Sequence, residues 1–221
     1  MPADLQTARD VVGEGTGAGD SNAENIEVIV NSLQRCTAVA VGCRERGQVT
    51  RAVNQMERTV ELCKTYENAH PRLRLESSRA HLNLGAMLSA GARHAEALTA
   101  IKEAQQDVAK LLNWTRECEA DDPAAAALAD QGRALRCAAL VAEGIEHEHL
   151  AASKRGPELA EDGSQRAQPH ARLYSEAESF AKSNLPPEHP VAALLSSMRQ
   201  EDAPQRRSEA ASVGPAPSPS P

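Results

Sequence analysis

Few residues of this 221-residue chain could do chemistry by their type and spacing. Four consecutive residues offer carboxylates and imidazoles, which are side chains that bind Zn²⁺: Glu146, His147, Glu148 and His149. They do not form the H-E-x-x-H pattern, and residues two apart point to different sides of a helix. Only Glu143 and His147 are expected to share a face. We therefore interpret the segment as a solvated helix and expect no metal and no other cofactor.

Other candidate sites are weaker. The glycine-rich segment 13–19 has the composition of a phosphate-binding loop, but no buried strand precedes it and no Lys-Ser/Thr pair ends it. No nucleophile has a recognisable local motif, so we expect that the protein is not an enzyme. An enzyme built around His147 and neighbouring carboxylates remains the third hypothesis.

The cysteines are odd in number and contain no C-x-x-C pair, so they are expected to be reduced structural thiols: Cys36, Cys43, Cys63, Cys118 and Cys137.

Composition excludes several classes of function. The chain has 24 Lys and Arg against 31 Asp and Glu, and no basic run, so nucleic acid is not an expected partner. No stretch approaches the roughly 20 apolar residues that span a bilayer, and residues 1–20 do not resemble a signal peptide, so we expect a cytoplasmic protein. With 41% hydrophobic but only 2% aromatic residues, the core is built from small aliphatic side chains, which favour an all-α fold.

The elements that position these residues are predicted to be helices between two disordered tails. The tails are the glycine-rich segment 1–22 and the Pro/Ser-rich segment 201–221, and they flank a helical domain over 23–200. A polar loop is expected at about 154–166, and a turn at 113–122 leads to Asp122-Pro123, an N-cap followed by proline. The helices are expected at 23–46, 49–66, 71–90, 93–112, 123–152, 168–184 and 190–200.

The middle of the chain contains a spacing of small and large apolar residues that lets two antiparallel helices pack closely. Gly85, Ala97 and Ala104 are the small residues expected where the two backbones approach. Larger apolar residues between neighbouring helix pairs complete the set: Leu84, Leu88 and Ile101. Trp114 is expected to cover the end of this copy.

Weaker copies flank the central one. The first contains Cys36, Val39, Ala40, Cys43, Gly47, Ala52, Met56 and Thr59. The third contains Leu140, Gly144, His147, Tyr174 and Ala177, provided that the polar loop is placed between its two helices. Glu143 occupies an apolar position of the third copy, which counts against it. The alternative is an Ala-rich helical bundle without repeats.

These residues resemble the motif of tetratricopeptide-repeat proteins, although His81 stands where that motif usually has tryptophan. The spacing between copies is longer than usual, as in kinesin light chains. Ala69-His70-Pro71 before Asn83-Leu84 is similar to the opening of such units, and Glu188-His189-Pro190 repeats it before a capping helix. The resemblance implies a short right-handed α-solenoid of about three helix pairs plus this cap.

In such solenoids the first helix of each pair lines a groove that binds a peptide or helix. The resemblance places four residues of the central copy in this groove: Arg79, Leu82, Asn83 and Ala86. Asn83 corresponds to the peptide-binding asparagine of the family, and Arg79 could pair with an acidic side chain. A solvated helix face is the alternative interpretation of both residues.

We therefore expect a non-enzymatic scaffold or adaptor whose partner is a protein. The long-repeat resemblance implies a cytoskeletal, motor or ciliary assembly. The alternative is a regulatory subunit that controls a separate soluble enzyme. An array of so few repeats exposes apolar helix faces at both of its ends. Self-association or incorporation into a larger assembly is therefore also expected.

Overall fold

The computed structural model describes residues 20–118, 122–154 and 169–197, and these are helical apart from the turns between them. The chain is all-α, as predicted. Its labelled helices are α2 (Asp20–Glu45), α3 (Val49–Tyr66), α4 (Pro71–Ala90), α5 (His94–Glu117), α6 (Pro123–Lys154) and α7 (Pro169–Asn184), and an unlabelled helix occupies 190–197. The two expected tails and most of the expected 154–166 loop lie outside the described residues.

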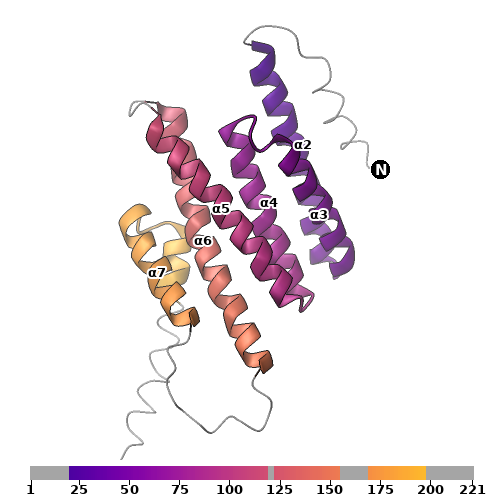
Figure 1. Cartoon of the computed structure of the whole chain (residues 1–221), viewed down its shortest axis with the longest axis vertical. Coiled ribbons are helices and arrows are strands. Elements are labelled where there is room, and N and C mark those ends of the chain that lie inside the picture. Colours follow the sequence, from indigo (N-terminus) through magenta and orange to yellow (C-terminus); the bar gives the residue numbers. More distant parts are fainter. Residues whose placement is uncertain (1–19, 119–121, 155–168, 198–221) are drawn as a thin grey trace, which may run out of the picture.

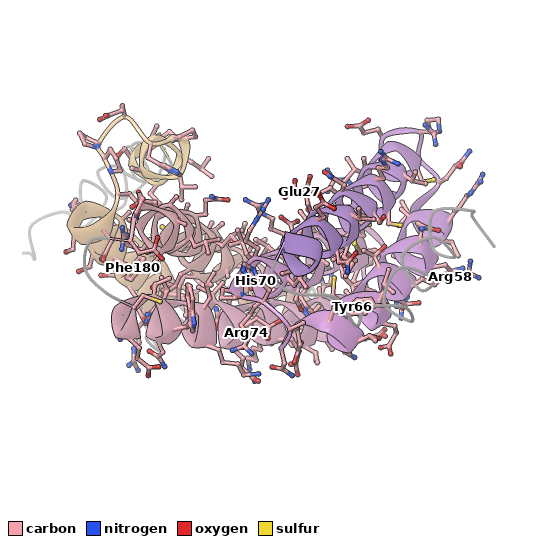
Figure 2. All side chains as sticks on the ribbon, turned by 90° about the horizontal axis from the view of Figure 1, so that it is seen from above. Glu27, Arg58, Tyr66, His70, Arg74 and Phe180 are labelled. Atoms are coloured by element: carbon pink, nitrogen blue, oxygen red, sulfur yellow. The ribbon has the colours of Figure 1, made fainter. Side chains whose placement is uncertain are left out.

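The helices pack in chain order as two layers (Figure 1). Each helix from α2 to α7 contacts the next one along the chain, and α4 also contacts both α2 and α6. Helices α2, α4 and α6 therefore form one layer, and α3, α5 and α7 form the other. Viewed from above, the array bends so that α2 and the C-terminal helices rise on the same side (Figure 2).

Two helices begin with the same histidine cap. His70 Nδ1 accepts a hydrogen bond from the backbone N–H of Arg72, and His189 Nδ1 accepts one from Val191, both at 3.2 Å. Each histidine precedes a proline, whose missing N–H costs nothing in the first helical turn. Burial and the neighbouring Arg72 lower the pKa of His70, which keeps its ring neutral and able to accept.

The turns that close the first two helix pairs also match. Gly47 has φ 72°, and the next backbone N–H, that of Gln48, donates to Cys43 O at 2.9 Å. Ala92 has φ 57°, and the N–H of Arg93 donates to Leu88 O at 2.9 Å. Both are left-handed helix ends, of the kind that glycine favours. The sequence indicated the first turn through Gly47, but alanine gives no such signal in the second.

Two helix ends differ from the sequence prediction. Helix α2 begins at Asp20 rather than near residue 23, and α5 continues to Glu117 where a turn was expected from residue 113. The extra turn of α5 carries Trp114, which packs with the buried side chains Leu75, Leu111 and Leu128. This tertiary contact accounts for the longer helix, because the local sequence Asn113–Glu117 is mostly polar. Asp122 caps α6 as expected, accepting from Ala124 N at 2.9 Å.

Within the described ranges, none of the helices combines the length and the apolar character that crossing a membrane requires.

Candidate functional site

Two helices approach closely at Gly85, where α4 packs on α5. A Cβ atom added to Gly85 would lie 2.8 Å from Ile101 Cγ1 and 3.3 Å from the carbonyl oxygen of Ala97. Ala97, Ile101 and Ala104 are each no more than 1% exposed, and Leu84 and Leu88 are also buried. The six residues that the sequence assigned to repeat packing therefore lie in one contact region between these helices and their neighbours.

Several residues that the sequence assigned to the flanking copies are also buried between helices. In the first copy, Ala40 of α2 and Ala52 and Met56 of α3 are fully buried. In the third, a Cβ atom added to Gly144 of α6 would lie 2.7 Å from the ring of Tyr174 of α7. One residue departs from the pattern. Val39 was expected at a packing position, but it is 52% exposed because no helix of the described chain lies against that side of α2.

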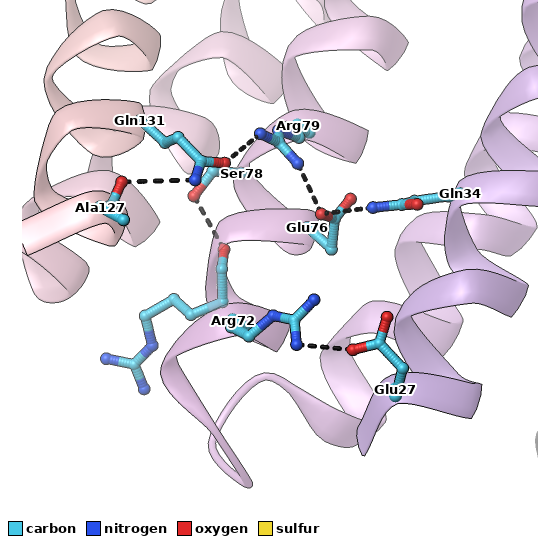
Figure 3. Close-up of polar contacts among 9 residues, drawn as sticks. Glu27, Gln34, Arg72, Glu76, Ser78, Arg79, Ala127 and Gln131 are labelled. Carbon is cyan, nitrogen blue, oxygen red and sulfur yellow. Dashed lines mark hydrogen bonds and ion pairs between the residues drawn. The ribbon is translucent and has the colours of Figure 1, made fainter. Parts of the chain in front are cut away.

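We define the inner face as the side of the α2–α4–α6 layer turned away from α3, α5 and α7. Polar side chains connect its three helices (Figure 3). Gln34 of α2 donates to Glu76 Oε1 of α4 at 3.1 Å, and Arg79 of α4 reaches the same oxygen at 2.6 Å. Arg79 then donates to Gln131 Oε1 of α6 at 2.7 Å. The face is therefore pre-organised by a continuous chain of hydrogen bonds.

Arg79 does not extend freely from this face. Its guanidinium is shared between Glu76 and Gln131, and only 35% of its side chain is exposed. Glu76 is buried, and its charge is matched by Arg79. A partner's acidic group would have to compete with this pair, so Arg79 serves first to join α4 to α6. A second ion pair, between Arg72 and Glu27 at 2.6 Å, joins α4 to α2.

The other expected groove residues remain more available. Asn83 and Leu82 are half-buried and Ala86 is exposed. Among the described residues, the side-chain amide of Asn83 has no hydrogen-bond partner. A side-chain amide has both a donor and an acceptor, so it can accept from a backbone N–H and donate to a backbone C=O of an extended peptide. Asn83 is thus one residue of this face whose hydrogen-bonding capacity is unused by the described chain.

A serine, a histidine and an aspartate meet inside the α4–α5 pair. Ser77 Oγ donates to Asp107 Oδ2 at 2.8 Å, and His81 Nδ1 lies 3.1 Å from Ser77 O and 3.4 Å from Asp107 Oδ2. His81 Nδ1 faces two acceptors, so it carries the ring proton. The serine bonds the carboxylate directly and all three residues are buried. This arrangement fixes two helices together and does not form a hydrolytic triad, which requires the serine to donate to the imidazole.

The acidic and histidine-rich end of α6 differs from the sequence interpretation. His147 Nε2 lies 3.7 Å from Glu143, as their shared face implies. However, Glu146 and His149 also share a face, since they are three residues apart, and they meet His94 at the start of α5. His94 Nδ1 lies 2.9 Å from Glu146 Oε2, and the rings of His94 and His149 stack with centroids 4.5 Å apart. Sequence reasoning considered only pairs within the segment and missed His94.

The cysteines form no disulfide in the structure, and four of the five are buried. Burial, with smaller contributions from nearby acidic residues including Glu76 and Asp107, raises the pKa of Cys63. Desolvation also raises the pKa of Cys118, the one half-exposed thiol. The thiols of Cys63 and Cys118 therefore stay protonated near neutral pH, which is expected of structural cysteines and not of nucleophiles.

No protein-family model, curated protein or solved structure matches this chain.

Proposed function

We propose that this chain is a tetratricopeptide-like interaction module, a non-enzymatic scaffold or adaptor that binds a peptide or helix of a protein partner on its inner face. The observation that carries the proposal is the repeated helix-pair contact. Ala40 and Ala52 are fully buried on α2 and α3. A Cβ atom added to Gly85 or to Gly144 would lie less than 3 Å from a side chain of the next helix. Stacked pairs of this kind offer an extended surface to partners.

The inner face supports this function in two ways. Its polar chain from Gln34 to Gln131 holds three helices at fixed distances, which lowers the entropic cost of binding. Asn83 lies on the inner face, and its side-chain amide makes no hydrogen bond with the described residues. Its neighbours Leu82 and Ala86 are apolar. A bound segment would then use Asn83 for backbone hydrogen bonds and the apolar neighbours for side-chain contact. A cytoplasmic place in a cytoskeletal, motor or ciliary assembly remains part of the proposal, carried by the sequence resemblance.

Affinity purification of the full chain followed by mass spectrometry tests the binding face. Asn83→Ala is expected to reduce recovery of the partner by about 10-fold, the loss that a buried amide's hydrogen bonds would cause. Asn54→Ala is the matched control, because Asn54 is an exposed asparagine on α3, in the other layer. A partner retained equally by both variants would contradict binding at the inner face. Filament or motor components among the partners favour an adaptor, and a single soluble enzyme favours a regulatory subunit.

Self-association or entry into a larger assembly is the second part of the proposal. The large apolar side chains exposed on the described residues lie at the two ends of the array. Val28 and Val39 are 38% and 52% exposed on α2, and Leu194 is 52% exposed on the last described helix. Covering these ends in a neighbouring molecule would remove apolar surface from water.

Size-exclusion chromatography with light scattering measures this second part. We expect the purified chain to have a mass above the 23.5 kDa of one copy, and Val39→Glu to shift it toward that value. Asn54→Glu is the control for adding a charge on an exposed helix position. A chain that is monomeric at every concentration, and a Val39→Glu variant with the same mass as the control, would remove self-association from the proposal.

A further inference from the structure

We propose that His94, Glu146 and His149 form a binding site for one divalent transition-metal ion, of which Zn²⁺ is the representative. One ligand atom from each residue lies within 4.8 Å of the others. His94 is the first residue of α5, and the other two lie on one face of α6. We name these three residues the His-Glu-His cluster.

The donor set fits the chemistry of this class of metal. Two imidazole nitrogens and one carboxylate oxygen are a common ligand set for Zn²⁺, and they leave a fourth position for water. Imidazole is a poor ligand for Mg²⁺ and Ca²⁺, which prefer oxygen, so these ions should not bind here. Donor atoms around a tetrahedral Zn²⁺ lie about 3.3 Å apart, given its bond lengths of about 2.0 Å. His94 Nδ1 and Glu146 Oε2 are 2.9 Å apart as a hydrogen bond, so Zn²⁺ would displace the proton that they share and move the two atoms slightly apart.

Burial distinguishes this cluster from ordinary surface acids and histidines. The side chain of Glu146 is only 3% exposed and that of His94 is 19% exposed, whereas His149 is exposed at the rim. A carboxylate in such a place is costly unless it is hydrogen-bonded or coordinates a metal, and in the structure its partner is His94 Nδ1 at 2.9 Å. The stacked ring of His149 lies 4.5 Å from that of His94, so a rotation of this exposed side chain brings its nitrogen toward the pair.

A metal ion here would join the second helix pair to the third. His94 belongs to the α4–α5 pair, and Glu146 and His149 belong to α6, so coordination would add a cross-link between neighbouring pairs. Binding to the folded state alone would raise the thermal stability of the chain in proportion to the free metal concentration. The inference is independent of partner binding, because the cluster does not include Asn83 or the polar chain of the inner face.

Calorimetric titration of the metal-free full chain with Zn²⁺ tests the site, with Co²⁺ as a visible probe of the ligand geometry. We expect one Zn²⁺ per chain, a rise in melting temperature on binding, and no binding of Mg²⁺. His149→Ala and Glu146→Gln should each weaken Zn²⁺ binding by about 10-fold or more. His149 is exposed, so His149→Ala should leave the melting temperature of the metal-free chain unchanged, which separates loss of the site from loss of the fold.

His147→Ala is the matched control, since His147 lies on the same helix but outside the cluster and beside Glu143. The His147→Ala variant should bind Zn²⁺ with the same affinity and stoichiometry as the original chain. The proposal is wrong if the chain binds no Zn²⁺ at micromolar concentration. It is equally wrong if His149→Ala binds Zn²⁺ as tightly as the original chain, or if His147→Ala weakens binding as much as His149→Ala does.

Discussion

Asp107→Ala is expected to destabilise the chain by about 3–5 kcal/mol, because it removes the acceptor at the centre of a buried polar network. Ser77 and His81 both direct a hydrogen toward Asp107, and all three residues are at most 5% exposed. Without the carboxylate, Ser77 Oγ loses the acceptor of its hydrogen bond, and His81 Nδ1 keeps only the carbonyl oxygen of Ser77. Urea unfolding monitored by circular dichroism measures the change in the free energy of unfolding.

Two further variants make this result specific. Asp130→Ala removes an exposed aspartate of α6 whose carboxylate pairs with Arg133, and it should change the stability by less than about 0.5 kcal/mol. Ser77→Ala removes one donor and leaves Asp107 with His81, so it should cost about 1 kcal/mol. Equal effects of Asp107→Ala and Asp130→Ala would show that the buried network does not hold α4 to α5.

The same network predicts how stability depends on pH. Burial acts to raise the pKa of Asp107, but hydrogen bonds from His81 and Ser77 outweigh it and hold this pKa below its ordinary value. The folded state therefore favours the ionised carboxylate, and its contribution is fully present above the unfolded pKa of about 4. This contribution to stability is lost as the pH falls through the lower pKa that Asp107 has in the folded state. The stability difference between the original chain and Asp107→Ala should therefore narrow as the pH falls below about 4.

Gly85→Ala is expected to lower the free energy of unfolding by about 2 kcal/mol, in the middle of the range for overpacking a close contact. The new Cβ atom would lie 2.8 Å from Ile101 Cγ1, near the backbone of α5, where the side chain cannot swing away. The α4 and α5 helices would have to separate, and this would weaken the buried contacts around Ala97 and Ala104.

Gly42→Ala provides the matched control with the opposite expected sign. Gly42 is also inside a helix, but its added Cβ atom would meet only the mobile end of the Arg46 side chain, at 3.3 Å. Alanine favours helices over glycine by about 1 kcal/mol, so this variant should be slightly more stable than the original chain. If both variants shift the urea midpoint in the same direction, Gly85 is not a point of close helix packing.

Sequence reasoning reached the helices and the contact between α4 and α5 because both depend on local patterns. Apolar residues at helical spacing, interrupted by Gly47, Pro71 and Pro123, are enough to place most helix boundaries. Gly85 and Ala97 could be matched because close packing leaves a signature of small residues. The end of α5 could not be predicted from the sequence, because it depends on the packing of Trp114 against Leu75 and Leu128, which are distant along the chain.

The polar contacts of the candidate sites were harder to predict from the sequence, because they also depend on residues that are distant along the chain. Arg79 was expected to be available to a partner, but Gln131 of α6 shares its guanidinium, and that pairing follows only from how α4 and α6 are stacked. His94 lies far from Glu146 in the sequence and no motif connects them. Asp107 gave no signal at all, because a buried aspartate looks like a surface one until its helix is packed.

Photo-crosslinking in cells tests the central claim most directly, namely that the inner face of stacked helix pairs binds a protein. A photoreactive amino acid replaces Asn83 on the inner face in one version of the full chain and Asn54 on α3 in the other. Binding at the inner face predicts that position 83 crosslinks to a discrete protein partner and that position 54 does not. No crosslinked protein at position 83, or the same protein crosslinked equally from position 54, would contradict it.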